Sequence, residues 1–353
     1  MTLRYIGSKA RMAEELATHI GNPDGGRFVD AFCGMGSVAA VAADLKWPVV
    51  LNDHLAYAVK MSAARLASKD EAAFASLGGY AAVIETLNAL PGKKGFIWQE
   101  YSPASAHASR ARIERRYFTE ENAARIDAIR AAIFDWRNHG ALNSAEETVL
   151  IADLLGAANR VANIAGTYGC FLAKWTTQGK NSLELRMRDL RGECVAVEQS
   201  IGDVKNLVID PRDTVYLDPP YTKRQYASYY HILETITHGD APLVEGVAGL
   251  RPWQHLASDY CYKRRALTSL TGLIRDLPAR RIILSYSNEG HISLPDLEAA
   301  LTGIGDIRTV PLKSIGRYRP NQTASDAGSA VDEYVMVIER NPDTQRLMAG
   351  AKS

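Results

Sequence analysis

The most constraining stretch of this chain is a pair of prolines that ends an apolar run. Thr214-Val-Tyr-Leu217 has the β-branched and aromatic composition of a buried strand, and Asp218-Pro-Pro-Tyr221 follows it without a spacer. Proline has a fixed φ angle and no backbone N–H, so it cannot continue the strand. We therefore predict a buried strand whose end passes a carboxylate and an aromatic ring to a rigid turn.

This turn has the groups needed to hold a planar molecule that carries an amino group. The carboxylate of Asp218 and the carbonyl of Pro219 would accept the two amine hydrogens, and the ring of Tyr221 would stack on the planar face. The fixed φ angles of Pro219 and Pro220 would keep Asp218 and Tyr221 on the two sides of a slot of fixed width. An ordinary strand-ending turn is the alternative interpretation, so other motifs have to decide between the two.

A second strand-to-turn motif lies near the N-terminus. The apolar run Phe28-Val-Asp-Ala-Phe32 leads into Cys33-Gly-Met-Gly36 and then into an alanine-rich helical stretch. Such a unit cradles nucleotides, because glycine lets the backbone approach a ligand and the helix start has free N–H groups. A second strand, Pro48 to Leu51, is followed by Asp53, where a carboxylate can accept both ribose hydroxyls. A glycine turn that serves only strand-to-helix packing is the alternative.

Length and composition restrict the class of protein. The 353 residues, 46% of them hydrophobic and 23% charged, can bury one large core or two smaller ones. With a formal net charge of +1, the chain would have to hold a nucleic acid by local basic patches. The four cysteines are scattered without a CxxC pair, so we expect no metal site and no disulfide framework. No apolar run reaches the length of a membrane span, and we expect a cytoplasmic protein.

After the second strand the pattern changes to alanine-rich helical periodicity, which continues to about residue 168. We predict helices over about 56–67, 71–90, 119–136 and 144–165. A capping box at Ser144-Ala-Glu-Glu147 would open the last of these helices. The residues between 91 and 117 read as a long irregular loop. Together these features predict a helical insertion between strands of a sheet.

Basic residues interleaved with aromatic ones mark candidate nucleic-acid surfaces. One such stretch is the loop over 91–117, a second follows the proline turn, and a third joins two strands predicted near 307–312 and 334–338. The alternative is a solvated loop and helix face. The candidate DNA contacts in these stretches are Arg112, Arg115, Arg116, Arg224, Tyr226, Arg317 and Arg319.

The motifs occur in an order that resembles a known family. Tyr5-Ile-Gly-Ser-Lys9, Phe28-Val-Asp-Ala-Phe-Cys-Gly-Met-Gly36, Asn52-Asp53 and Asp218-Pro-Pro-Tyr221 are similar to motifs of the Dam-like, alpha-class DNA adenine methyltransferases. The resemblance covers most of the chain outside the insertion. The segment from Arg224 to Glu234 resembles the branch of the family that accompanies type IIS restriction systems.

The resemblance implies an α/β fold with a Rossmann-like, mostly parallel methyltransferase sheet and helices on both of its faces. Residues 1–54 and 169–353 would form this catalytic domain, and 55–168 a mainly helical insertion for DNA target recognition. The methyl donor would be S-adenosyl-L-methionine, and the acceptor the N6 amine of an adenine flipped out of DNA. The implied donor-binding residues are Tyr5, Gly7, Lys9, Asp30, Phe32, Gly34, Gly36, Asp53, Asp203 and Asp218.

The expected partner is double-stranded DNA, bound by a monomer, with a restriction endonuclease that acts separately.

Other functions stay open. Gly34-x-Gly36-x-x-Ala39 followed by Asp53 also fits a nicotinamide-dependent oxidoreductase, although the turn at Asp218 would then have no role. The same scaffold could bind nucleic acid without catalysis, and RNA could replace DNA because the turn would contact only the flipped base.

Overall fold

The chain folds into two compact units. The computed structural model describes residues 12–312 and 333–340. Of these, the sheet unit contains residues 12–54, 195–225, 257–312 and 333–340, and the helical unit contains 55–194 and 226–256. The helical unit thus extends past residue 168, where the predicted insertion ends, and takes in a second segment after the proline turn.

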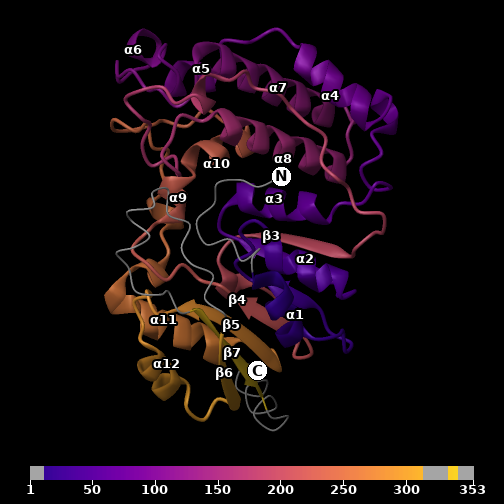
Figure 1. The fold of residues 1–353 in the computed structure, drawn as a ribbon, viewed down its shortest axis with the longest axis vertical. Helices are drawn as coiled ribbons and strands as arrows, with labels where there is room; N and C mark the ends of the chain where they lie inside the picture. The colour runs from indigo at the N-terminus through magenta and orange to yellow at the C-terminus, as the bar shows by residue number, and fades with distance from the viewer. Residues whose placement is uncertain (1–11, 313–332, 341–353) are drawn as a thin grey trace. The chain divides into compact units, whose positions relative to one another are not determined.

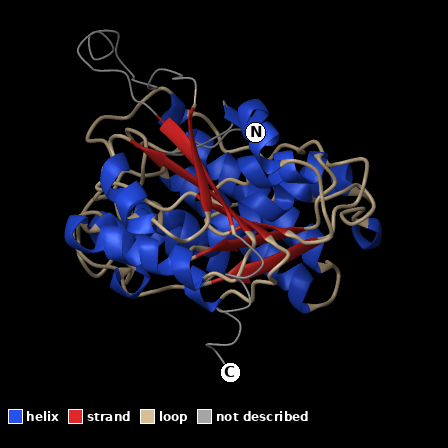
Figure 2. Cartoon of the chain, turned by 90° about the horizontal axis from the view of Figure 1, so that it is seen from below, coloured by secondary structure: helices blue, strands red, loops and turns tan. Residues whose placement is uncertain are grey.

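One twisted seven-stranded sheet in the order β3-β2-β1-β4-β5-β7-β6 organises the described part of the sheet unit (Figures 1 and 2). Strands β1 to β5 are parallel, whereas β7 pairs antiparallel with β5 and β6. This confirms the predicted fold class, and β6 and β7 agree with the two strands predicted near 307–312 and 334–338. The strands are β1 (Phe28–Asp30), β2 (Val49–Asp53), β3 (Val197–Ile201), β4 (Thr214–Leu217), β5 (Arg281–Ser287), β6 (Asp306–Pro311) and β7 (Glu333–Glu339).

Alternating side chains of the central strands face opposite sides of the sheet. On one side, Phe28 of β1 stacks on Tyr216 of β4, with ring centroids 6.3 Å apart, and α2 packs on β1 and β2. On the other side, Val215 and Leu217 join a large apolar cluster that includes helices α11 and α12. The helices of this unit are α1 (Ala13–Ile20), α2 (Ser37–Asp44), α11 (Lys263–Asp276) and α12 (Leu294–Leu301).

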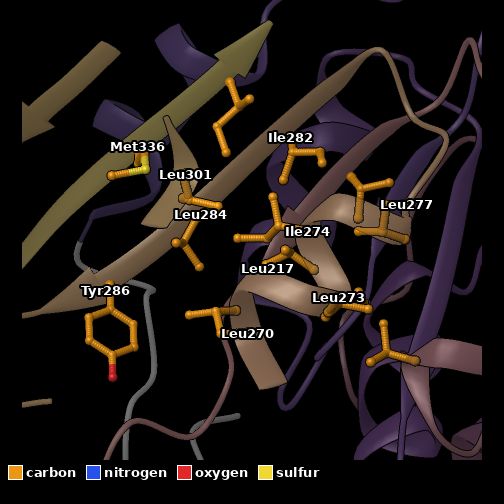
Figure 3. Close-up of a cluster of buried hydrophobic side chains, with 14 of the residues drawn as sticks. Leu217, Leu270, Leu273, Ile274, Leu277, Ile282, Leu284, Tyr286, Leu301 and Met336 are labelled. Carbon is orange, nitrogen blue, oxygen red and sulfur yellow. The ribbon is translucent and has the colours of Figure 1, made fainter. Parts of the chain in front are cut away.

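The apolar cluster is the main core of the sheet unit (Figure 3). Leu270, Leu273 and Ile274 recur at helical spacing on α11, so one face of this helix carries an apolar stripe, which Leu277 continues directly after the helix ends. The stripe packs on side chains of β4, β5 and β7, among them the fully buried Leu217. Burial of this face holds α11 across the parallel strands.

The described part of the helical unit contains eight α-helices, only some of which were predicted. They are α3 (Ala56–Leu66), α4 (Tyr80–Ala89), α5 (Phe96–Tyr101), α6 (Ser105–Ala108), α7 (Glu120–Asn138) and α8 (Ser144–Val161), followed after the proline turn by α9 (Tyr226–Tyr229) and α10 (His231–His238). The helix predicted over 71–90 is interrupted at Gly78 and Gly79, whose φ angles of 83° and 98° lie in the left-handed region. The loop predicted over 91–117 contains α5 and α6, because Ile97 and Tyr101 share a buried face.

Helix α8 begins with a capping box one residue earlier than predicted. The Asn143 side chain accepts a hydrogen bond from the Glu146 backbone at 2.9 Å, and the Glu146 carboxylate accepts one from the Asn143 backbone at 2.9 Å. Asn143 is the N-cap because Glu146 lies three residues after it, the spacing that the reciprocal bonds require. Among residues 12–312 and 333–340, no helix combines the length and the hydropathy needed to cross a membrane.

Leu270 tests how much the apolar cluster stabilises the sheet unit. Leu270→Ala should lower the free energy of unfolding by about 2–5 kcal/mol, because it removes a fully buried side chain and leaves a cavity under α11. Thr268→Ala, two residues away and exposed, is the matched control and should change it by less than about 0.5 kcal/mol. Urea denaturation measures both. Equal effects of the two substitutions would contradict the packing described.

Candidate functional site at the sheet edge

The strand order of the sheet reverses between β1 and β4. From β1 the chain proceeds to β2 and β3 on one side, and β4 then pairs with β1 on the other side. In parallel α/β sheets, ligands bind beyond the carboxyl ends of the strands at such a reversal. Asp30 ends β1 and Asp218 directly follows β4, so two of the predicted carboxylates lie on the two strands that flank it.

Asp30 is the most perturbed carboxyl group of this edge. It is 1% exposed, and burial followed by the charge of Asp218 raises its pKa to about 8. The charge of Asp53 adds to this shift, whereas the backbone amides of Phe32 and Ala39 oppose it. The Oδ1 atom of Asp30 has no hydrogen-bond partner among the described residues. The site therefore holds a carboxyl group that is protonated at neutral pH and would ionise next to a cation.

The glycine turn lies between the ends of β1 and β2. Gly34 and Gly36 have φ angles of 47° and 68°, which a residue with a Cβ atom rarely adopts. Gly36 is the N-cap residue of α2 and donates its N–H to Cys33 O at 2.7 Å. The carboxylate of Asp53, at the end of β2, accepts a hydrogen bond from the Gly34 backbone at 3.1 Å. This bond fixes the predicted ribose-binding carboxylate against the predicted nucleotide turn.

Contacts made by β5 and the turn after it hold the proline turn in place. The Tyr221 carbonyl accepts a hydrogen bond from the His291 backbone at 3.0 Å, and the Tyr221 ring meets the Tyr286 ring edge-on, with centroids 5.7 Å apart. Gly290 packs so closely on Tyr286 that an added Cβ would lie 2.4 Å from the ring. Pro219 is buried, while Asp218 and Tyr221 are half-buried. The turn is thus a supported element with two partly accessible side chains.

Further predicted residues line the same edge. Phe32 follows β1 and packs edge-on against Tyr260, with centroids 5.6 Å apart. Asp203 follows β3, accepts a hydrogen bond from the Lys205 backbone at 3.0 Å and lies 4.0 Å from the His54 imidazole. The predicted residues Tyr5, Gly7, Lys9, Arg317 and Arg319 lie outside the residues that the structure describes.

The predicted DNA contacts differ in their surroundings. Arg224 is exposed in the sheet unit, and Tyr226 begins α9 and stacks on Tyr230. Arg112 is exposed, whereas Arg116 forms an ion pair with Glu114, with two hydrogen bonds of 2.7 and 3.1 Å.

The prediction that Arg115 contacts phosphate is wrong for this structure. Its side chain is completely buried, and its guanidinium forms an ion pair with Glu100 at 2.7 Å. The guanidinium also donates to the backbone carbonyls of Glu100, Gly246 and Val247, each at 3.1 Å. A buried charge must be paired and hydrogen-bonded, and Arg115 meets both needs inside the helical unit.

Arg115 helps to hold the loop of residues 246–249, in which every backbone carbonyl accepts a hydrogen bond from a side chain. The next two carbonyls, of Ala248 and Gly249, accept hydrogen bonds from the buried hydroxyls of Tyr117 and Tyr101 at 2.9 and 3.0 Å. Gly249 has a φ angle of 65°, and a Cβ there would lie 2.8 Å from the Arg115 guanidinium. The basic and aromatic residues that suggested a nucleic-acid surface therefore serve in part to build the helical unit.

Arg115 should accordingly behave as a residue of the core. Arg115→Ala leaves Glu100 buried without its partner and should lower the free energy of unfolding by about 3–5 kcal/mol. Arg110→Ala, an exposed neighbour in the same loop, should change it by less than about 0.5 kcal/mol. Chemical denaturation followed by tryptophan fluorescence compares the two. A stable Arg115→Ala variant with weakened DNA binding would instead support the prediction from the sequence that Arg115 contacts DNA.

Several residues of the edge had not been predicted. Asn52 is buried, and its amide donates to the carbonyls of Ala31 and Gly202 at 3.1 and 3.3 Å, which joins the ends of β1, β2 and β3. Tyr286 and His291 support the proline turn from a different part of the sequence. Asn52 had a local signal, as a polar residue next to Asp53, whereas the roles of Tyr286 and His291 depend on contacts far apart in sequence.

Comparison with known proteins adds a family assignment. Residues 5–292 match the family model described as D12 class N6 adenine-specific DNA methyltransferase. The chain is 31% identical to Type II methyltransferase M.FokI of Planomicrobium okeanokoites and 30% identical to Modification methylase StsI of Streptococcus sanguinis; each match covers 96% of this chain but 53% and 52% of those proteins. It is 30% identical to Type II methyltransferase M.NlaIII of Neisseria lactamica, over 96% of this chain and 99% of that protein. The chain thus spans about half the length of the first two relatives and nearly all of the third.

Proposed function

The chain belongs to the D12 class N6 adenine-specific DNA methyltransferases, and we propose that it transfers a methyl group from S-adenosyl-L-methionine to the N6 amine of an adenine in double-stranded DNA. The observation that carries this proposal is the pair of carboxyl groups, Asp30 and Asp218, on the two strands that flank the reversal of strand order. One is buried beside the glycine turn, and the other begins the proline turn.

The residues around Asp30 fit the methyl donor. A buried carboxyl oxygen without a partner suits the cationic methionyl end, and the carboxylate of Asp53 suits the ribose hydroxyls. Gly34 and Gly36 let the backbone come close to the donor, and Phe32 would line its site. When bound, S-adenosyl-L-methionine supplies a methyl group activated by a positively charged sulfur.

The proline turn fits the acceptor. Asp218 and the Pro219 carbonyl would accept the two hydrogens of the adenine amine, which directs the nitrogen lone pair toward the methyl group. The ring of Tyr221, held by Tyr286 and His291, would stack on the base. Adenine inside a duplex cannot reach this turn, so the base must be flipped out. Most of the catalysis would then come from positioning, with no covalent intermediate on the protein.

The relatives' names suggest the setting of the reaction. M.FokI and M.NlaIII are named as type II methyltransferases and StsI as a modification methylase. By analogy, we place this chain in a restriction-modification system, as a cytoplasmic monomer beside a separate endonuclease. Residues 55–168 would carry DNA target recognition, with Arg112 and Arg116 among the contacts, and Tyr226 of α9 would add a further contact.

The affinity for the donor should depend on pH through Asp30. Because its pKa is raised to about 8, Asp30 must lose a proton before it can pair with the cationic donor. Donor affinity should therefore increase as pH rises from 6 to 8, by at most about tenfold per pH unit, and level off above 8. Isothermal titration calorimetry measures this. Asp30→Asn keeps the shape but removes the titration, so its profile reports the donor's own ionisation. Parallel profiles would contradict the assignment.

Substitutions in the proline turn should separate chemistry from binding. Asp218→Ala removes the acceptor that orients the amine, so kcat should fall by at least about a hundredfold while duplex DNA still binds. Tyr221→Phe keeps the ring and should cost little. Tyr221→Ala loses a stacked base, worth roughly 1–3 kcal/mol, and should flip a fluorescent adenine analogue less completely. Labelled methyl transfer and 2-aminopurine fluorescence provide the two readouts.

Asp210→Ala is the control for Asp218→Ala, because it removes a carboxylate from the loop before β4, at the other end of that strand. It should leave kcat within a few-fold of the wild-type value. Near-normal methyl transfer by Asp218→Ala would mean that the turn is only structural, and the proposed function of this site would then be wrong.

A further inference from the structure

Four exposed cations lie in the two segments that border the proline turn in the sheet unit. Lys223 and Arg224 come two and three residues after Tyr221, and Lys263 and Arg264 open helix α11. All four side chains are exposed, and none forms an ion pair with a carboxylate in the described part of the chain. We call this set the turn-side cations.

Hydrogen bonds fix the two segments to each other and to the turn. Gln225 and Ser258 exchange two bonds, of 3.2 Å from the amide to the Ser258 carbonyl and 2.9 Å from the Ser258 backbone to the amide oxygen. The Cys261 thiol donates to the Arg224 carbonyl at 3.2 Å. The His291 imidazole donates to the Cys261 carbonyl at 3.1 Å, while its backbone N–H bonds to Tyr221. The cations are therefore held at a set position beside the proposed adenine-binding turn.

Helix α11 begins in a way that is unfavourable for its own stability. Its first three residues are Lys263, Arg264 and Arg265, and its first turn contains no acidic residue. The positive end of a helix dipole repels cations and attracts anions. Arg265 forms an ion pair with Asp259 at 3.0 Å, whereas Lys263 and Arg264 have no such partner within residues 12–312 and 333–340. Lys263 and Arg264 thus place two positive charges at the end of the helix that repels them, which indicates that an anion binds there and compensates them.

The surroundings favour a nucleic-acid anion. Tyr262, which precedes the helix, is 44% exposed, and the Arg265 guanidinium lies 5.4 Å from the centre of its ring. Exposed aromatic residues between cations are typical of surfaces that contact a nucleic-acid backbone. Contacts to phosphates fix the position of a protein on DNA without reading its sequence, and an enzyme that flips a base out of the duplex needs such positioning next to that base.

We propose that Lys223, Arg224, Lys263 and Arg264 bind the phosphates of the DNA strand next to the flipped adenine. The proposal rests on the proposed function and adds to it a backbone-binding surface on the sheet unit, separate from target recognition by the helical unit. Because these side chains would contact phosphates and not the reacting amine, they should determine DNA affinity and its salt dependence rather than the rate of methyl transfer.

A matched pair of variants on one helix tests the proposal. Arg264→Gln and Arg275→Gln each remove one exposed positive charge, the first from the start of α11 and the second from its last turn. Fluorescence anisotropy with a duplex oligonucleotide between 50 and 300 mM salt gives the slope of log Kd against log salt. For Arg264→Gln we expect the slope to fall by about 0.9, with roughly tenfold weaker binding at 0.1 M salt. Arg275→Gln should keep the wild-type slope.

Two double variants extend the test. Lys263→Gln with Arg264→Gln, and Lys223→Gln with Arg224→Gln, should each lower the slope by up to about two units. Both should keep the wild-type affinity for S-adenosyl-L-methionine, and kcat at saturating DNA should stay within a few-fold. All four residues are exposed, and loss of the cations at the start of α11 relieves their repulsion by the helix dipole, so thermal unfolding should show equal or slightly higher stability and exclude misfolding as the cause.

The outcomes separate this inference from the proposed function. If Arg264→Gln and Arg275→Gln have the same salt slope in an enzyme that methylates DNA, the turn-side cations do not bind phosphate and only this inference is wrong. Wild-type slopes in the double variants, with binding of an acidic protein lost instead, would overturn it equally. If the wild-type chain transfers no methyl group to DNA, the proposed function itself fails.

Discussion

The geometry of the candidate site depends on a carboxyl group that is buried where the parallel strands end. Asp30 ends β1, Asp53 ends β2 and Asp218 follows β4, so three carboxyl groups share one edge of the sheet. In the unfolded chain an aspartate has a pKa near 4. Between about pH 4 and pH 8 the folded chain keeps a proton on Asp30 that the unfolded chain has lost, so this residue makes the folded state less stable as pH rises through that range. Such a cost is expected where a site is arranged for a ligand instead of for stability.

The rest of the sheet unit keeps this edge in a fixed shape. The apolar stripe of α11 packs on β4, which leads into the proline turn, and on β5, which pairs with β4. Asn52 joins the ends of three strands, and Asp53 holds the glycine turn. The same helix α11 that fills the core also begins beside the turn with cations and with no acidic residue in its first turn. Core packing and the proposed substrate contacts are therefore supplied by the same elements.

The parts of the fold that could be predicted from the sequence are those with a local cause. β4 and its proline turn were evident because an apolar run of strand composition meets two residues that cannot continue it. The glycine turn was evident because an apolar run, two closely spaced glycines and a helical stretch follow one another, and the left-handed backbone at Gly34 and Gly36 explains why glycine is needed there. The start of α8 and the interruption at Gly78 also have local causes. There, however, alternative helix caps and helix breakers give nearly the same sequence pattern, so the sequence does not choose between them.

The parts that could not be predicted depend on contacts between distant residues. Arg115 looked like a phosphate ligand because it lies in a basic loop, and only the fold brings Glu100 and the carbonyls of residues 246 and 247 around it. In the same way, the support of Tyr221 by Tyr286 and His291, and the bonds from Gln225 to Ser258, join segments separated by more than 30 residues. A charged residue in a basic stretch can therefore be core or surface, and its sequence neighbours do not distinguish the two.

The most direct measurement of the central claim is the identity of the modified nucleoside. Plasmid DNA from a host that expresses this chain, and DNA treated with the purified chain and S-adenosyl-L-methionine, would be digested to nucleosides and analysed by mass spectrometry, with the modified positions mapped by sequencing. We expect N6-methyl-2′-deoxyadenosine, confined to one sequence motif. Methylated cytosine, or unmodified DNA alongside methylated RNA, would contradict the assignment of the proline turn to adenine in DNA.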